Sequence, residues 1–364
     1  MTPMENPRTR MADVVKQAVA GSKGSGHGFA KEIWGAMGCN RLLDPDAVAG
    51  GGQESCQRLT RTARALAEHG QDLGVTLSWI IHHLTAGVLT KTGPSDSSRR
   101  ALMETLSSGG ATLSLAVSEP GGGGHPKYLT TRADRDKAGW VISGDKAYLT
   151  NGPVAAAFLV VAITGESAGK KVFSTFLVDQ DTPGLTLGPA MTLPFLTSAP
   201  HGGIRLDRCR VKHGAMVGLE GRAYPDLVLP LRQREDAVMT GAVTGAMTAL
   251  LTGAAAGLPG SRKEEGACLE ALGRLAALSH AAVALSDHLA ALVDGQQPGH
   301  DEIHLVFRDL ASGFVRDLDA FCRRETISLS CPELLRDLKA SAKLGETVSG
   351  IRTRKLGKRL ADSV

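Results

Sequence analysis

The sequence contains few cysteines and no close pair of them. Six cysteines stand far apart along the 364 residues, at Cys39, Cys56, Cys209, Cys268, Cys322 and Cys331. Zinc knuckles need cysteines two to four residues apart, and disulfide frameworks belong mainly to small secreted domains. The spacing therefore argues against both and favours a reducing cytoplasm.

A strong charge of one sign is also missing. Lys and Arg number 41 against 37 Asp and Glu, which gives a formal charge of +4. One basic run, IRTRKLGKRL (351–360), stands near the C-terminus, where we expect a solvated helix end. Because nucleic-acid binding needs a concentrated basic surface, we expect no nucleic-acid partner.

Long apolar runs are absent as well. The N-terminal stretch lacks the apolar core of a signal peptide, and no later run approaches the roughly 18 apolar residues of a membrane span. We therefore expect a soluble, cytoplasmic protein with no membrane partner. The 42% of hydrophobic residues are enough for two or three packed layers or domains.

The spacing of apolar residues changes twice along the chain. From 28 to 110 they recur three and four apart, which is typical of helices. Short runs rich in Val, Leu, Phe and Thr follow, separated by Gly, Asp and Pro, and they predict strands. After 222 the helical spacing returns. We therefore predict an α+β fold with an N-terminal helical domain (1–110), a small central β-barrel or sandwich (111–222) and a C-terminal helical bundle (223–364).

Two motifs in the central segment are rich in turn residues. AVSEPGGGGH (116–125) places a Ser-Glu-Pro corner before four glycines, and GDKAYLTNGP (144–153) ends in a Thr-Asn-Gly turn. The first resembles the Thr-Glu-Pro-x-Ala-Gly-Ser-Asp segment of the acyl-CoA dehydrogenase superfamily, and the second its Gly-x-Lys-x-Trp-Ile-Thr-Asn-Gly segment. The preceding helices and LDRCRVKHGAMVGLEG (206–221) are similar in order and spacing, so the resemblance covers nearly the whole chain.

The resemblance implies an FAD cofactor. In the family the two segments present backbone N–H groups and a hydroxyl to the isoalloxazine ring, whose nitrogens and carbonyl oxygens need fixed partners. On this chain Val117, Ser118 and Thr150 would take that role. Tyr148 would pack beside the ring, where the family has Trp.

Contacts from a neighbouring subunit are implied too, because the family is homotetrameric. RKEEG (262–266) is similar to the family's Arg-x-x-Phe-Gly motif, with Glu265 in place of Phe. The guanidinium of Arg262 suits the flavin pyrophosphate. We therefore expect a homodimer or homotetramer, with fewer cofactor contacts than usual, since a later Gln and a glycine-rich segment of the family are not recognisable.

The glycine loop implies a thioester substrate, acyl-CoA or another acyl thioester. Glycines there let the chain pass close to a pantetheine arm. Gly124 and His125 stand where the family has Ser and Asp, so an anchoring hydroxyl is missing. His125 and Lys127 either form a basic pair aimed at phosphates or belong to a solvated turn.

The implied reaction, α,β-dehydrogenation, needs a carboxylate that takes the α proton while hydride passes to flavin N5. The family places this Glu in the first helix after the β domain or in the loop before the last helix. Counting back from Gly245 gives Glu235 on the helix. Reading the loop without a gap places Gly345 on the loop site, and a one-residue shift places Glu346 there. Counting forward from 220–221 puts Arg234 on the helix site instead. Glu235 is the preferred base and Glu346 the alternative. For each of them, the interpretation without catalysis is a solvated helix carboxylate.

Other histidines carry weaker signals. His300 and His304 are one helical turn apart, a spacing compatible with zinc, but a third ligand is not evident, so we expect a surface helix and no metal. For His82 and His83, in an apolar helical stretch, we expect packing.

Three functions follow from the resemblance. The leading one is an FAD-dependent oxidoreductase of fatty acid metabolism that passes electrons to an electron-transferring flavoprotein. A flavin oxidase or monooxygenase, or a dehydrogenase of carrier-protein-bound acyl groups, would keep the fold. A degenerate, non-catalytic paralogue would act as a binding or assembly subunit.

Overall fold

The computed structural model describes residues 31–49, 55–91, 97–344 and 346–362. The contacts group the chain into two compact units. Of the described residues, 31–49 and 77–235 form one, called here the sheet unit, and 55–76 and 236–362 form the other, called the helical unit. The division into three domains at 110 and 222 stays a prediction.

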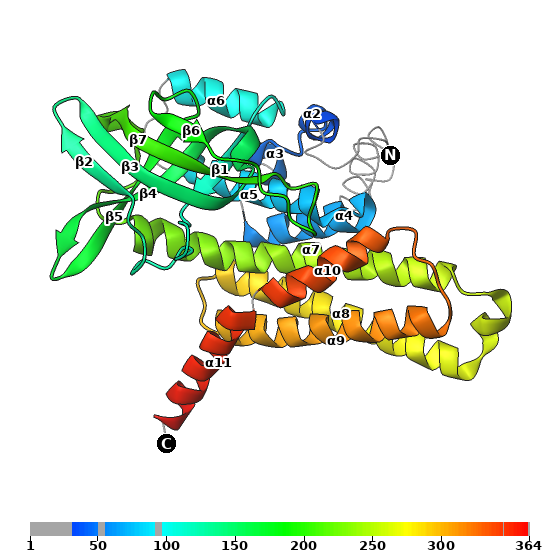
Figure 1. Cartoon of the computed structure of the whole chain (residues 1–364). Helices are drawn as coiled ribbons and strands as arrows, with labels where there is room; N and C mark the ends of the chain where they lie inside the picture. Colours follow the sequence, from blue (N-terminus) through cyan, green and yellow to red (C-terminus); the bar gives the residue numbers. More distant parts are fainter. Residues whose placement is uncertain (1–30, 50–54, 92–96, 345, 363–364) are drawn as a thin grey trace, which may run out of the picture. The chain divides into compact units, whose positions relative to one another are not determined.

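Eight strands make one sheet in the order β6-β7-β3-β2-β4-β5-β8, with β1 added in parallel to β4 (Figure 1). Their bounds are Thr112–Ala116 (β1), Arg132–Asp136 (β2), Gly139–Thr150 (β3), Ala155–Ser167 (β4), Lys170–Asp179 (β5), Leu185–Leu187 (β6), His201–Lys212 (β7) and Met216–Val217 (β8). Trp140, Phe158 and Phe176 lie in a buried cluster against this sheet. The apolar runs predicted as strands are confirmed, and the fold is α+β as predicted.

The helices of the sheet unit are α2 (Lys31–Cys39), α3 (Pro45–Ala49), α6 (Ser97–Ser107) and the part of α5 (Leu73–Lys91) from Leu77 onward. The apolar α5 packs against the residues that join α2 to α3. On α5, Trp79 Nε1 donates to Leu42 O at 2.7 Å, and the Nε2 atoms of His83 and His82 lie 2.8 Å from Leu42 O and 3.3 Å from Leu43 O. The packing role predicted for both histidines is confirmed, and burial lowers the pKa of His82 to about 3.

The helical unit is a bundle of long helices. It comprises α4 (Cys56–Gly70), α7 (Leu229–Ala256) from Asp236 onward, α8 (Gly266–Asp294), α9 (His300–Arg324), α10 (Pro332–Leu344) and α11 (Glu346–Ala361). Helices α8 and α9 run side by side (Figure 1). The carboxylate of Asp294 accepts from the N–H groups of Cys56 and Gln57 at 2.6 and 3.1 Å, so α8 supplies acceptors to the free N-terminus of α4.

Three helices are long and apolar enough to cross a membrane by length and composition: Leu73–Lys91, Tyr224–Ala256 and Gly266–Asp294. The expectation that no segment reaches that length is therefore wrong. Single Thr, Ser, Gly and His residues interrupt the apolar runs but leave the average hydropathy high. Within the structure 83% of the first window is buried, against 33% of the last.

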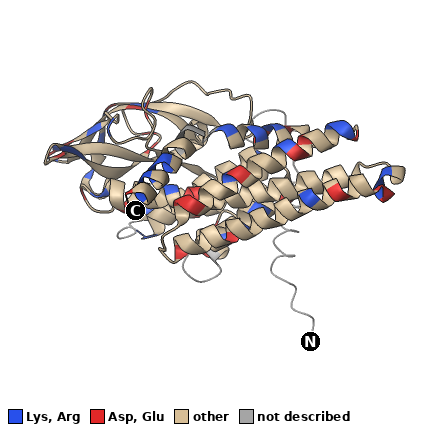
Figure 2. Cartoon of the chain, turned by 90° about the horizontal axis from the view of Figure 1, so that it is seen from below, with Lys and Arg blue, Asp and Glu red and all other residues tan. Residues whose placement is uncertain are grey.

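Charged residues are spread over the helices and strands with both signs interspersed (Figure 2). The basic C-terminal run lies on α11 and is mostly exposed, as predicted for a solvated helix end. Arg352 is the exception, because its side chain is 14% exposed and donates to Asp236 at 2.6 Å and to His304 Nδ1 at 2.8 Å. His300 and His304 are 7% and 8% exposed, so the predicted surface position of this pair is wrong.

Glycines allow α4 and α7 to touch backbone to backbone. A Cβ placed on Gly245 would lie 2.1 Å from the carbonyl oxygen of Arg64, and one on Gly241 would lie 2.1 Å from that of Thr60. Neither carbonyl can move without shifting α4.

We expect Gly245→Ala to lower the free energy of unfolding by roughly 1–3 kcal/mol, because the helices must separate. Gly253→Ala in the same helix is the matched control. Its Cβ would meet nothing closer than Leu329 Cδ2 at 3.9 Å, so alanine should stabilise the helix by up to about 1 kcal/mol. Urea unfolding followed by circular dichroism measures both, and equal shifts in the two variants would contradict the close contact.

Candidate functional site

A buried ion pair joins the Ser-Glu-Pro corner to β3. Lys146 Nζ lies 2.9 Å from Glu119 Oε1, and the two side chains are 0% and 4% exposed. Lys146 Nζ also donates to Val117 O at 3.0 Å. The other hydrogen bonds to the Glu119 carboxylate come from the hydroxyl and N–H of Thr130, both at 2.7 Å, and from the N–H of Thr131 at 3.0 Å. One carboxylate thus fixes three separate stretches of chain.

The pair is ionised at neutral pH. Burial alone would raise the pKa of Glu119, but the charge of Lys146 and the hydrogen bonds from Thr131 and Thr130 outweigh it and lower the pKa to about 2. Burial lowers the pKa of Lys146 to about 8, although Glu119 opposes that shift. Both groups therefore carry their charges at pH 7.

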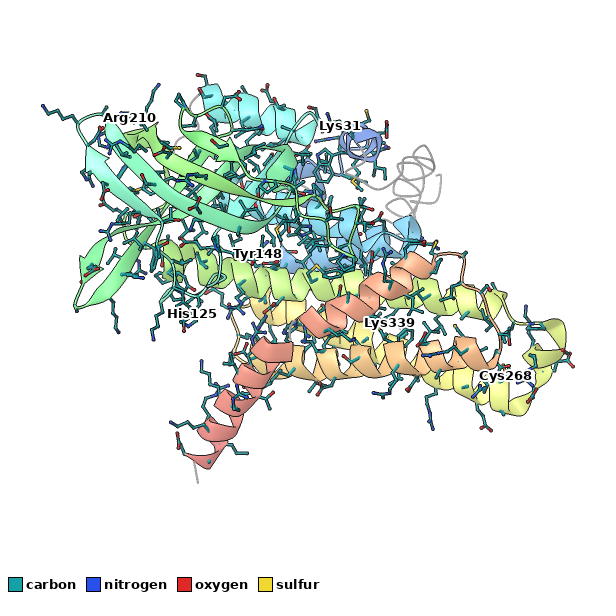
Figure 3. The ribbon with its side chains drawn as sticks, in the orientation of Figure 1. Lys31, His125, Tyr148, Arg210, Cys268 and Lys339 are labelled. Atoms are coloured by element: carbon teal, nitrogen blue, oxygen red, sulfur yellow. The ribbon has the colours of Figure 1, made fainter. Side chains whose placement is uncertain are left out.

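A break in the β3–β7 register between Lys146 and Leu149 exposes an aromatic ring near the end of β3. Tyr148 has φ +60° and Asn151 has φ +64°, in the left-handed region that side chains rarely adopt. Asn151 is buried and its Nδ2 donates to Ser78 O at 3.0 Å, which holds the Thr-Asn-Gly turn in place. Tyr148 remains 56% exposed (Figure 3). The strain thus presents this ring to solvent.

The corner lies directly beside this break in the register. Ala147 N–H donates to Ser118 O at 2.9 Å. Ser118 and Thr150 are partly exposed, and Val117 is almost buried. Val117, Ser118, Tyr148 and Thr150 thus lie along two adjoining stretches, and their contacts with a flavin stay predictions.

The glycine loop returns to the same corner. Glu119 and Gly123 exchange two backbone hydrogen bonds of 3.1 Å. A Cβ added to Gly124 would lie 3.5 Å from Ser118 Oγ, and Tyr224 Oη donates to Gly124 O at 3.0 Å. His125 is exposed, labelled in Figure 3 below Tyr148, and its ring lies 5.4 Å from that of Tyr128.

His201 belongs to the site and was missed in the sequence. It pairs with Thr150 across β3 and β7, and its Nε2 lies 3.2 Å from Thr150 Oγ1. Its Nδ1 lies 2.8 Å from Ala199 O, and burial lowers its pKa. The sequence holds no signal for this contact, because a strand register decides it.

A cavity of about 280 Å³ opens in the sheet unit between α5 and the segment 217–234. Its wall is mainly apolar and includes Leu84, Val88, Val217, Leu219, Leu227 and Leu231. Charged groups join the lining from Lys91, Arg222, Asp226 and Arg234, and Arg222 donates two hydrogen bonds to Asp226 at 2.7 and 3.0 Å. Such a cavity suits an apolar ligand with an anionic end.

The predicted catalytic glutamates lie apart from this cavity or outside the described side chains. Glu235 is partly buried in α7 and is not in the cavity lining, whereas the preceding Arg234 is. Glu346 begins α11, and its side chain lies outside the described residues, as does Gly345. Their catalytic roles stay predictions.

Arg262 lies in the helical unit, between α7 and α8. Its guanidinium pairs with Glu265 and, at 2.7 Å, with Glu325, whose side chain is 1% exposed. The hydrogen bonds from Arg324 and Arg262 lower the pKa of Glu325. Arg262, which was predicted to bind a pyrophosphate, is thus paired with two carboxylates. Among the described residues no group of three or more His, Cys, Asp and Glu is placed to hold a metal ion.

Comparisons with known proteins point to one group. The model of the acyl-CoA dehydrogenase middle domain matches residues 114–209. Mitochondrial isobutyryl-CoA dehydrogenase of Dictyostelium discoideum is 30% identical over 153 residues, which are 42% of this chain and 36% of that protein. The match therefore spans little more than a third of that relative's length.

Two solved structures share the fold over nearly the whole chain. A glutaryl-CoA dehydrogenase from Mycobacterium smegmatis in complex with FADH2 has a TM-score of 0.80 at 19% identity, covering 98% of this chain and 95% of that one. The prolyl acyl carrier protein oxidase AnaB has a TM-score of 0.80 at 21% identity, covering 97% and 98%. At these identities the likeness is one of fold.

We expect Glu119→Gln to lower the free energy of unfolding by roughly 3–5 kcal/mol, because it leaves the Lys146 charge buried without its partner. Glu220→Gln is the control, since its pair with Arg135 is about half exposed and should contribute at most about 1 kcal/mol. Urea midpoints at pH 7 compare the two, and a Glu119→Gln loss no larger than that of the control would contradict the assignment.

The same variant gives a pH test. The pKa of Glu119 is about 2 in the folded protein against an ordinary 4.5, so its contribution is complete above about pH 4.5 and is lost as the pH falls towards 2. The stability difference between wild type and Glu119→Gln should therefore be smaller at pH 3 than at pH 6. A difference that stays constant would show that another group governs acid unfolding.

Proposed function

We propose that this chain, which belongs to the acyl-CoA dehydrogenase superfamily, is an FAD-dependent oxidoreductase that acts on an acyl thioester. The observation that carries the proposal is the end of β3 where the Ser-Glu-Pro corner lies beside it, called here the flavin edge. There the Glu119–Lys146 pair binds the Val117 carbonyl, and the exposed Tyr148 ring and the hydroxyl-bearing Ser118 and Thr150 lie on the same two stretches.

The residues at this edge fit a flavin ring. The ring of Tyr148 is 56% exposed at a strained backbone position, which suits stacking against a flat aromatic cofactor. Ser118 and Thr150 offer partly exposed hydroxyls to the polar rim of such a ring. When bound, FAD supplies a two-electron acceptor for the hydrogen that leaves the β carbon.

The pyrophosphate of FAD fits its predicted partner, Arg262, less well than the ring fits the sheet unit. Arg262 is already paired with Glu265 and Glu325, so an anion must displace at least one carboxylate to reach it. The sheet unit therefore carries the main flavin contacts in this proposal, and Arg262, supplied by a neighbouring subunit as the resemblance implies, is a secondary one.

The cavity beside α5 fits the acyl thioester. Its apolar wall suits a hydrocarbon chain. Lys91, Arg222 and Arg234 also line the cavity, and their positive charges suit the anionic tail of a thioester such as acyl-CoA. Acyl-CoA is the first candidate substrate. Glu235 follows the cavity-lining Arg234 but is not itself in the lining, so the thioester end must extend past the cavity to reach it. A carboxylate, Glu235 or alternatively Glu346, would there take the α proton onto an oxygen, and the electrons of the broken C–H bond would stay on the α carbon.

A second candidate is an acyl group carried on a carrier protein. Gly124 and His125 replace the Ser and Asp expected for a coenzyme A tail, so the tail is held differently on this chain. The solved prolyl acyl carrier protein oxidase has the same fold. Transfer of electrons to an electron-transferring flavoprotein, assembly as a homodimer or homotetramer and a cytoplasmic location are further parts of the proposal.

We expect the full chain to take up FAD and the bound flavin band to bleach when one acyl thioester is added without oxygen. Visible absorption follows both steps, with acyl-CoAs and acyl-pantetheines of several lengths as the panel. Protein that stays colourless after FAD is added would contradict the proposal and leave the non-catalytic paralogue.

Matched tyrosine variants test where the flavin binds. Tyr148→Ala should weaken FAD binding about tenfold, in the range of one lost stacking contact. Tyr128→Ala removes an equally exposed ring, 57% against 56%, from the glycine loop and should leave FAD affinity unchanged. Equal losses in both variants would place the flavin elsewhere.

The base is tested separately by α-proton exchange in deuterated water, which requires no electron acceptor. We expect Glu235→Gln to lower the exchange rate by 10²-fold or more, because the amide cannot take a proton, and Glu346→Gln to leave it near wild type. The reverse pattern would assign the base to Glu346. Thermal unfolding of both variants controls for loss of the fold.

A further inference from the structure

Thr150 and His201 form a short chain of hydrogen bonds at the candidate flavin edge. Thr150 Oγ1 lies 3.2 Å from His201 Nε2, and His201 Nδ1 lies 2.8 Å from Ala199 O. The two residues are register partners on β3 and β7, and His201 is 9% exposed. The imidazole thus has one partner on each nitrogen.

These contacts fix which nitrogen carries the proton. A carbonyl oxygen can only accept, so His201 Nδ1 must donate to Ala199 O. A neutral imidazole has one N–H, which leaves Nε2 as an acceptor. The partner on Nε2 is the hydroxyl of Thr150, which must therefore donate to it. Burial lowers the pKa of His201, in keeping with a neutral ring.

The direction of this bond decides what Thr150 offers to a ligand. A hydroxyl has one proton and two lone pairs. With its proton directed at His201, Thr150 presents only lone pairs to a ligand at its partly exposed side. A group with an N–H can bind there, and a group with only a lone pair meets repulsion.

We propose that His201 is a positioning residue that turns the Thr150 hydroxyl into an obligate acceptor facing the flavin ring. This inference rests on the proposed function. The oxidised ring has a bare lone pair at N5, whereas the two-electron-reduced ring has an N–H there. A Thr150 hydroxyl that meets N5 and is oriented by His201 would therefore pair with the reduced form only, and His201 would then raise the reduction potential of the bound flavin.

The test is the potential of FAD bound to the full chain, measured by equilibration with a reference dye. His201→Phe keeps a flat ring but frees the hydroxyl of Thr150 to donate to the oxidised ring. We expect the equilibrium to shift about tenfold towards oxidised flavin, which is a potential about 30 mV lower for a two-electron couple. His213→Phe, at an exposed histidine just after β7, should leave the potential unchanged.

A double variant shows whether His201 acts through Thr150. In a Thr150→Val background the hydroxyl is gone, so His201→Phe should no longer change the potential. An equal shift in both backgrounds, or no shift in either, would overturn the inference.

Nitrogen NMR of the wild-type protein without FAD gives an independent readout. We expect His201 as the neutral tautomer with its proton on Nδ1, and a proton on Nε2 would overturn the inference even where variants unfold. Failure of the wild type to take up FAD would remove the proposed function and the inference with it. Uptake with an unchanged potential in His201→Phe would remove the inference alone.

Discussion

The Glu119–Lys146 pair is the constraint on which the candidate site depends. It is buried, and its carboxylate also binds the backbone of Thr130 and Thr131, so the corner, β3 and the start of β2 cannot move independently. Burying two charges costs several kcal/mol per ion, which only good geometry and further hydrogen bonds offset. The strong effect expected on removing one partner thus reflects the charge left buried, and the pair itself joins these three stretches in one arrangement.

Much of the fold was predictable because local pattern and final position agree. Apolar runs such as Ala155–Ser167 became buried strands, and residues spaced three and four apart became the long helices. The strand Arg132–Asp136 escaped prediction because its sequence is polar, with only Ala133 buried. It is a strand because β3 pairs with it, and that is a property of the sheet rather than of its residues.

The candidate site also contains residues that local sequence motifs indicate and contacts that only the folded chain creates. Val117, Ser118, Tyr148 and Thr150 could be proposed from the sequence because they stand inside two short motifs. His201 could not, because its contact with Thr150 depends on the β3–β7 register. The pairing of Arg262 with Glu325 joins residues 63 positions apart, and no spacing rule reveals it.

Tyr148 combines backbone strain with exposed aromatic surface at one position. Its left-handed backbone costs about 1 kcal/mol or more for any residue with a Cβ, and glycine would avoid that cost. Glycine would also remove the exposed ring. Relief of the backbone strain and retention of the exposed aromatic surface therefore exclude each other at this position.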